Sequence, residues 1–174
     1  MHPERLVFGI YGKGDYWRAY FRSFREKKIV RIYGSGKQLR QDIYEDDMAR
    51  ALLDSLTNPV TNRKIYNLAG ARFTLVEYLR TIRRLTASRF VIVRVPLWLV
   101  RGLSLSFGRF SSSLAGRLSR IEASCRDETM DIEELRRDTG FEPTPIAEGL
   151  GKVIAHLSQG AGPISKSNAS GPLR

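Results

Sequence analysis

Residues 34–51 read GSGKQLRQDIYEDDMARA, and this single stretch holds the signals for a turn, an extended segment and a helix. The glycines at its beginning favour a tight turn, because glycine tolerates backbone conformations that other residues avoid. Residues 41–44 are expected to be extended. Asp46 and Asp47 follow, where a carboxylate can accept a free backbone N–H and start a helix over residues 48–56. The stretch predicts a strand-to-helix unit of an α/β fold, with Asp47 as a helix cap rather than a ligand contact.

The alternation of predicted strands and helices continues before and after residues 34–51. Runs of β-branched and aromatic residues predict strands at residues 6–11, 28–33, 65–69 and 90–95. The spacing of Trp17, Tyr20, Phe21 and Phe24 predicts one further helix, and the capping pair Thr74 and Glu77 begins another. Pro96 precedes a helix that is expected to run through Leu103. The capping pair Asp131 and Glu134 begins a helix that ends at Gly140, and Thr144-Pro145 precedes a last helix to Leu157. We expect residues 1–158 to form one compact unit.

The composition narrows the class of protein. Residues 159–174 are rich in Gly, Ser and Pro and are expected to form a disordered tail. The single cysteine, Cys125, excludes an internal disulfide, and the two histidines stand apart, so no metal site is expected. The chain starts without the pattern of a secretion signal, which favours a cytoplasmic protein. Its net charge of +11 favours anionic partners.

Two short motifs resemble a dinucleotide-binding loop and a catalytic Tyr/Lys pair, but their residues do not suit these functions. Residues 9–15 place glycines between a strand and a helix, yet Asp15 stands at the helix entry, where it would repel the pyrophosphate of a dinucleotide. Tyr33 and Lys37 have a spacing that, on a helix, can pair a lysine with a catalytic tyrosine. Two intervening glycines disfavour a helix there. We therefore predict no catalytic residue.

Several segments carry a resemblance to a known family. They are IYGKGD at 10–15, the block at 34–51, IYNLAG at 65–70, VPLWL at 95–99, and residues 131–143, which end in Gly-Phe-Glu-Pro. In this order they resemble the extended short-chain dehydrogenase/reductases of the NAD-dependent epimerase/dehydratase family. The resemblance covers roughly residues 6–157.

The resemblance implies the C-terminal portion of an extended Rossmann-type α/β fold, comprising the last parallel strands and a small mixed α/β lobe that binds substrate. Family members use NAD or NADP and oxidise a sugar nucleotide with a tyrosine base assisted by a lysine. The glycine motif for the cofactor and the helical Tyr/Lys pair have no counterpart in this sequence. The chain is therefore expected to be a fragment that contributes nucleotide-sugar binding. It should need the N-terminal Rossmann half, and neither bind NAD(P) nor turn over substrate alone.

The resemblance also assigns site residues. Arg40 matches the family arginine that pairs with the nucleotide diphosphate, and Arg126 has the approximate place of a second phosphate-contacting arginine. A guanidinium suits this role because its planar donors engage phosphate oxygens in pairs. The alternative for Arg40 is a surface salt bridge. Ile10 and Tyr11 would line the nicotinamide end of the cleft.

Other functions remain open at this stage. A nucleic-acid-binding module would use the positive charge and the aromatic residues, but it requires a continuous basic face and is disfavoured. The apolar stretch Val95 to Phe110 suggests peripheral membrane contact. A hydrophobic edge left without its neighbouring strands would favour homo-oligomers.

Overall fold

The fold is α/β, as the sequence predicts, in a computed structural model that describes residues 9–99, 102 and 112–159. The strands are β1 (Ile10–Tyr11), β2 (Ile29–Tyr33), β3 (Leu39–Arg40), β4 (Ile43–Tyr44), β5 (Phe73–Thr74) and β6 (Val91–Val95). The helices are α1 (Asp15–Glu26), α2 (Glu45–Thr57), α3 (Leu75–Leu85), α5 (Ser112–Ser124), α6 (Glu133–Thr139) and α7 (Ile146–Gln159), with a 3-10 turn η1 (Pro59–Thr61).

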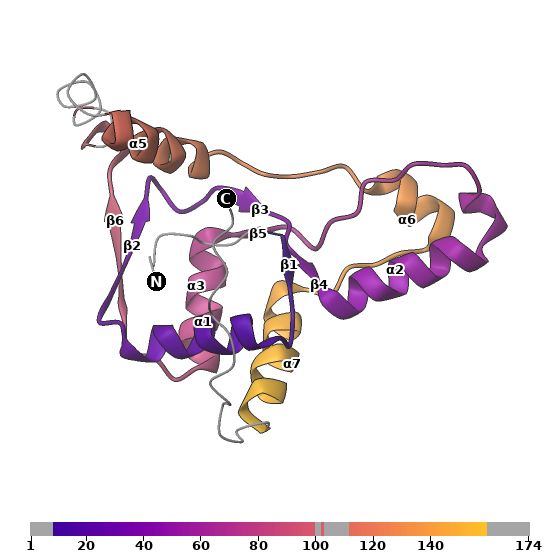
Figure 1. Cartoon of the computed structure of the whole chain (residues 1–174), viewed down its shortest axis with the longest axis horizontal. Helices are drawn as coiled ribbons and strands as arrows, with labels where there is room; N and C mark the ends of the chain where they lie inside the picture. Colours follow the sequence, from indigo (N-terminus) through magenta and orange to yellow (C-terminus); the bar gives the residue numbers. More distant parts are fainter. Residues whose placement is uncertain (1–8, 100–101, 103–111, 160–174) are drawn as a thin grey trace.

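The described strands pair in three short ladders. β1 runs parallel to β4, and β2 runs parallel to β6 over its whole length, so that Ile29 lies beside Val91 and Tyr33 beside Val95. β3 pairs with β5 in the antiparallel direction. Figure 1 shows α3 between the β2–β6 ladder and α7, with α1 crossing near one end of that ladder. The mixture of parallel and antiparallel pairs matches the expected mixed α/β lobe.

The main core lies between α1, α3 and α7. The predicted aromatic stripe of α1 is confirmed, since Trp17, Phe21 and Phe24 are buried and Tyr20 packs against them. Thr74 and Glu77 form the predicted capping box of α3, in which each side chain accepts an N–H from the other residue. The core is completed by Tyr11, Ile32, Tyr44, Phe73, Leu75, Val76, Tyr78, Leu79, Ile82, Phe90, Ile146, Leu150, Val153 and Leu157.

A second, smaller core joins α2 to α6. It consists of Ile43, Ala51, Ala69, Ile132, Leu135 and Phe141. Figure 1 shows α2 and α6 together at the side of the molecule away from the β2–β6 ladder. α6 ends at Gly140, as predicted, and this glycine has a left-handed backbone at φ 70°.

The predicted caps of α2 and α6 are wrong. α2 begins at Glu45, before Asp47, and no side chain caps it. The carboxylate of Asp47 instead accepts the backbone N–H of Thr144 at 2.6 Å and its hydroxyl at 2.8 Å, just before α7. α6 likewise has Ile132 at its N-cap and no capping box, although Asp131 accepts the N–H of Glu133. At Asp47 the local pattern is overridden by a contact with a distant residue.

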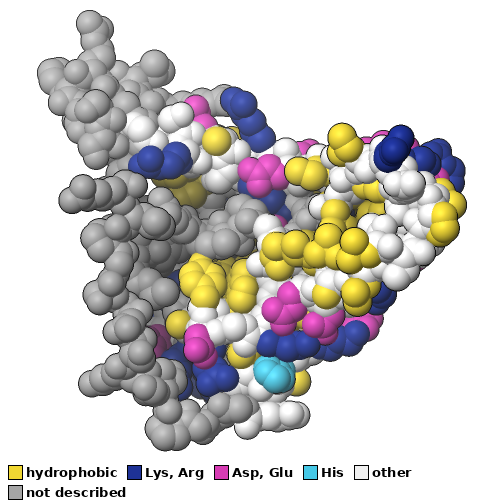
Figure 2. Space-filling view, turned by 45° about the vertical axis from the view of Figure 1, so that its right-hand side comes forward, with side chains coloured by type: hydrophobic (Ala, Val, Ile, Leu, Met, Phe, Trp, Pro, Cys, Tyr) yellow, Lys and Arg dark blue, Asp and Glu magenta, His cyan; other side chains and the backbone are white. Residues whose placement is uncertain are grey.

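The strand predicted over residues 65–69 is also wrong. These residues form no ladder with any described strand, and Ile65 is 95% exposed. An extended segment becomes a strand only when a neighbour supplies a ladder of hydrogen-bond partners, and among the described residues only the following Gly70 bonds to a neighbouring segment, through the carbonyl of Gln41. The exposed apolar side chains in this part of the chain are those of Leu52, Leu53, Leu56, Val60 and Ile65. Figure 2 shows hydrophobic side chains gathered on the side of the molecule that carries α2.

Some predictions fall partly outside the described residues. Residues 97–99 are helical, as expected after Pro96, but the rest of the predicted helix through Leu103 and most of the stretch 95–110 are not described. The same holds for residues 6–8 and for almost the whole of the predicted tail. Among the described residues, no helix has the length and hydrophobicity that crossing a bilayer requires.

Candidate functional site

The candidate site is built on the segment around β3, where three polar side chains at every second position are buried. Gln38 is 6% exposed, Arg40 0% and Asp42 9%. Alternate residues of an extended segment point to the same side, so the three side chains share one face. A turn leads into this segment, with Gly34 at φ 76° and Gly36 at φ 71°. At Gly36 a Cβ atom would lie 2.5 Å from Ile32 and Val76, so only glycine fits there.

The guanidinium of Arg40 is held by two groups, one from the last residue of α5 and one from the chain that follows it. One terminal nitrogen lies 2.6 Å from a carboxylate oxygen of Glu128. The other donates a hydrogen bond to the carbonyl of Ser124. The Arg40 side chain is 1% exposed while that of Glu128 is 56% exposed. The cation is thus enclosed by the fold, and its anionic partner sits at the surface.

Residues 124–130 run along β3 and fix this arrangement. The N–H of Leu39 donates to Asp127 at 2.7 Å, and the carbonyl of Leu39 accepts the N–H of Glu128 at 2.9 Å. Arg126 lies in the same segment, and its side chain is exposed. The structure therefore brings the two predicted phosphate-binding arginines to one region, with Arg40 buried and Arg126 at the surface.

Asp42 links β3 to the start of β1. Its carboxylate accepts the backbone N–H of Gly9 at 2.8 Å. Burial raises the pKa of Asp42 from 3.8 to about 6, while the Gly9 hydrogen bond and the charge of Arg40 act in the opposite direction. With this pKa, the Asp42 carboxyl beside Arg40 is half-protonated at about pH 6 and mostly ionised at neutral pH.

Of the two residues predicted to line the cofactor end of the cleft, one is accessible. Ile10 is 48% exposed. Tyr11 is 1% exposed, stacks on Tyr44 with ring centroids 5.6 Å apart, and its pKa is raised mainly by burial. Its hydroxyl reaches Gly149, where a Cβ would come within 2.0 Å of it. Tyr11 is therefore a core residue in this structure, and Ile10 is the one available for a ligand contact.

The glycine loop at residues 9–15 already holds an anion of its own chain. The N–H of Lys13 donates to Glu45 at 2.7 Å, and the Lys13 ammonium pairs with Asp46 at 2.8 Å. Asp15 is in the first turn of α1, as the sequence indicates. The loop thus has a carboxylate at the amide where a pyrophosphate would bind. Tyr33 ends strand β2 and Lys37 follows the turn, so this pair is not on a helix.

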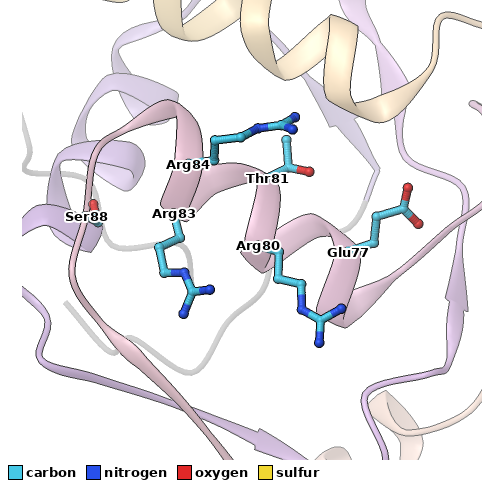
Figure 3. Close-up of a pocket in the computed structure, with 6 residues that line it drawn as sticks. All are labelled: Glu77, Arg80, Thr81, Arg83, Arg84 and Ser88. Carbon is cyan, nitrogen blue, oxygen red and sulfur yellow. The ribbon is translucent and has the colours of Figure 1, made fainter.

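A hollow of about 540 Å³ lies on α3 and is lined by none of the four predicted site residues. Figure 3 shows the described residues that line it, which are Glu77, Arg80, Thr81, Arg83, Arg84 and Ser88. Among the described residues, no group of three His, Cys, Asp or Glu side chains lies close enough to hold a metal ion.

Three residues of the site were not predicted from the sequence. Glu128 and Ser124 could not be found, because nothing local marks them as partners of an arginine in a distant segment. Asp42 had a usable signal, since Gln38, Arg40 and Asp42 occupy alternate positions of a segment that is expected to be extended. Such an alternation predicts a polar face.

The comparisons with known proteins give the following similarities. Residues 7–69 match the family described as "NAD dependent epimerase/dehydratase family". No curated protein matches the sequence. Among solved structures, the chain resembles UDP-glucuronic acid 4-epimerase from Bacillus cereus in complex with NAD, with a TM-score of 0.58 at 15% identity, covering 87% of this chain and 43% of that one.

Two further structures give the same result. UDP-glucose 4-epimerase with UDP-glucose from Thermotoga maritima has a TM-score of 0.58 at 19% identity, covering 87% of this chain and 44% of that one. ADP-L-glycero-D-manno-heptose-6-epimerase from Helicobacter pylori has a TM-score of 0.59 at 14% identity, covering 87% and 42%. At these identities the likeness shows the fold. The chain spans less than half of the length of each of these structures.

Proposed function

We propose that this chain, whose residues 7–69 match the NAD dependent epimerase/dehydratase family, binds the diphosphate of a sugar nucleotide, with Arg40 as the principal anion anchor. The observation that carries the proposal is the asymmetric ion pair of Arg40. A buried guanidinium meets a carboxylate that is largely in solvent. Glu128 then occupies the position that a phosphate oxygen takes when substrate is bound.

When a diphosphate replaces the Glu128 carboxylate, the positive charge of Arg40 keeps an anionic partner. Arg40 would be costly to bury without a counter-charge, so it needs an anion in both states. Glu128 can swing into water because its side chain is 56% exposed. A diphosphate offers paired oxygens to the planar donors of Arg40. Arg126, exposed on the same segment, would contact the second phosphate.

The cofactor and the chemistry would come from another stretch of polypeptide. We propose that NAD or NADP binds to a Rossmann half that pairs with this chain, and that this chain supplies substrate binding without a catalytic base. Two observations support such a partner. The chain spans less than half of the structures that it resembles, and α2 exposes Leu52, Leu53 and Leu56 to solvent. An exposed apolar face of this kind is typical of an interaction site.

The test is the affinity of the chain for UDP, measured by calorimetry with uridine as the ligand that lacks phosphates. Arg40→Ala should weaken UDP binding by about 1.5 to 3 kcal/mol, the range for hydrogen bonds to charged groups. Arg40→Lys should recover part of this loss, since an ammonium lacks paired planar donors. The matched control is Arg136→Ala, which removes an arginine paired with Glu142 on α6 and should leave UDP affinity unchanged.

Folding of the variants has to be checked, because Arg40 is buried. Circular dichroism and thermal melting establish that Arg40→Lys and Arg40→Ala retain the fold. If Arg40→Lys is folded and binds UDP as tightly as the unmodified chain, the diphosphate is not held by paired donors of Arg40. If only Arg126→Ala loses affinity, the anchor has been assigned to the wrong arginine.

A further inference from the structure

The net positive charge of the chain comes from two segments. Residues 27–41 and 78–121 together contain 14 of the 29 Lys and Arg residues and none of the 18 Asp and Glu residues. The rest of the chain contains 15 Lys and Arg residues and 18 Asp and Glu residues, which is a net charge of −3. The net charge of +11 is therefore due entirely to these two segments.

The fold brings the two segments together in the β2–β6 ladder. β2 and β6 are parallel, and Arg31 lies beside Val93. Ile32 is part of the main core, and Val30 and Ile92 pack against it, so one face of the ladder is turned inward. Figure 1 shows the ladder at the outer edge of the molecule, with α3 on its inner side.

The opposite face of the ladder is apolar and exposed, and we call it the outer face. It is formed by alternate residues of the two strands, which are Ile29, Arg31, Tyr33, Val91, Val93 and Val95. Ile29 is 52% exposed, Val91 59% and Val93 40%. Directly after β6, Trp98 is 70% exposed and Leu99 40%. Neighbouring apolar side chains with this exposure are typical of an interaction surface.

The cations at the outer face are not neutralised by carboxylates. Arg31 belongs to the face, and Lys28 and Arg89 precede the two strands. All three side chains are exposed, and among the described residues none of the three has an ion-pair partner. The exposed leucines of α2 have different surroundings, because that helix carries four carboxylates and one arginine. The two apolar surfaces thus suit different partners, and the outer face suits an anionic one.

We propose that the outer face of the β2–β6 ladder binds the surface of an anionic phospholipid bilayer. Its aliphatic side chains enter the boundary between the head groups and the acyl chains, while Arg31, Lys28 and Arg89 lie beside the lipid phosphates. Binding at a bilayer surface depends on the apolar area that is buried and on the attraction between cations and anionic lipids. The outer face supplies both.

Other occupants fit the outer face less well. Nucleic-acid interfaces are strongly polar, and bases stack on aromatic side chains rather than on Ile or Val. In a two-fold dimer the same face would lie against itself, which would bring Arg31 and its neighbouring cations together without a carboxylate. The outer face contains neither Arg40 nor Glu128, so the proposal does not depend on the sugar-nucleotide function.

The experiment is co-sedimentation of the whole chain with vesicles of phosphatidylcholine, either alone or mixed with phosphatidylglycerol. The mixed vesicles should bind the chain at least about tenfold better at low salt, and added salt should weaken this binding. Arg31→Ala/Arg89→Ala should lower it by about tenfold or more, since each cation near an anionic surface contributes about 1 kcal/mol and 1.4 kcal/mol is a factor of ten. The matched control, Arg136→Ala/Arg137→Ala, removes the same charge from α6 on the other side of the molecule (Figure 1) and should change binding by less than about twofold.

A second pair of variants tests the apolar part of the outer face. Val91→Thr/Val93→Thr keeps the size and the strand propensity of the side chains, so the fold should be retained, as circular dichroism and thermal melting can establish. It should weaken binding to the mixed vesicles by about threefold to tenfold, because less apolar area enters the bilayer. The control Leu53→Gln/Leu56→Gln changes two exposed leucines of α2 and should bind these vesicles as the unmodified chain does.

Several results would overturn the proposal. They are equal binding to neutral and mixed vesicles, equal losses in the two arginine double variants, and unchanged vesicle binding by Val91→Thr/Val93→Thr. If vesicles do not bind but a short single-stranded RNA does, and Arg31→Ala/Arg89→Ala loses the RNA, the face belongs to nucleic acid. If sedimentation velocity without vesicles shows a dimer that Val91→Thr/Val93→Thr abolishes, the face belongs to a second copy. UDP binding that depends on Arg40 is unaffected by each of these results.

Discussion

Arg40 and Glu128 form an ion pair of 2.6 Å in which the arginine side chain is 1% exposed and the glutamate side chain 56% exposed. The two partners therefore differ in how easily they can be replaced. The arginine is fixed by the hydrogen bond to Ser124 and by burial in the fold. The glutamate is already largely in solvent, which makes the pair suited to exchanging Glu128 for another anion.

The pH dependence of stability should reveal the buried carboxyl beside this pair. The pKa of Asp42 is raised from 3.8 to about 6, chiefly by burial, so the folded chain keeps this proton to a higher pH than the unfolded chain does. The contribution of Asp42 to stability is therefore fully present below about pH 4 and declines up to about pH 6. A shift of this size corresponds to about 2 to 3 kcal/mol. Urea unfolding at pH 4, 5, 6 and 7 measures it.

Asp42→Asn provides the comparison. Asparagine keeps an oxygen for the N–H of Gly9 but does not titrate, so the unfolding free energy should fall less between pH 4 and pH 6 than in the unmodified chain. Identical pH profiles for the two proteins would mean that the Asp42 carboxyl is not buried as the structure has it.

Asp47 should contribute strongly to stability, although it caps no helix of its own. It is 1% exposed and accepts the N–H and the hydroxyl of Thr144 together with a guanidinium nitrogen of Arg50. Asp47→Ala leaves a buried N–H without an acceptor and should lower the unfolding free energy by about 2 to 4 kcal/mol. The neighbouring Asp46→Ala removes an exposed pair with Lys13 and a hydrogen bond with Tyr44, and should cost less than about 1 kcal/mol. Similar losses for the two variants in chemical denaturation would contradict this account.

The exposed side of α2 should control association rather than stability. Leu56 is 83% exposed, so Leu56→Glu removes little burial and should leave the melting temperature unchanged. Sedimentation velocity should show less self-association for this variant, because an exposed apolar face favours contacts between molecules. In contrast, Leu135→Ala in the small core, where the side chain is 2% exposed, should cost about 2 to 5 kcal/mol. A large loss of stability in Leu56→Glu would mean that the α2 face is packed within the chain.

The sequence predicted the elements whose signals are local. The aromatic spacing of α1 and the capping box of α3 each lie within one or two turns of helix, and both are present. Residues 65–69 have the composition of a strand but no neighbouring strand among the described residues, and composition cannot supply hydrogen-bond partners.

At the candidate site, too, the sequence could not predict contacts between distant segments. Arg40 could be singled out from its motif, but its surroundings could not, because Ser124 lies 84 positions further along the chain. The alternative of a surface salt bridge is met only in part, since Arg40 pairs with Glu128 but its side chain is enclosed. Burial of this kind depends on where the segment after α5 packs, and no local pattern specifies that.

The most direct test of the anion exchange at Arg40 is the UDP affinity of Glu128→Gln. The variant removes the competing carboxylate and leaves the side-chain volume almost unchanged. In low-salt buffer it should melt at a lower temperature than the unmodified chain, because Arg40 loses its counter-charge, and UDP should restore part of that loss. UDP should bind to Glu128→Gln more tightly than to the unmodified chain by about tenfold, or 1.4 kcal/mol. Equal or weaker binding by a folded Glu128→Gln would contradict the claim that a diphosphate takes the place of Glu128 on Arg40.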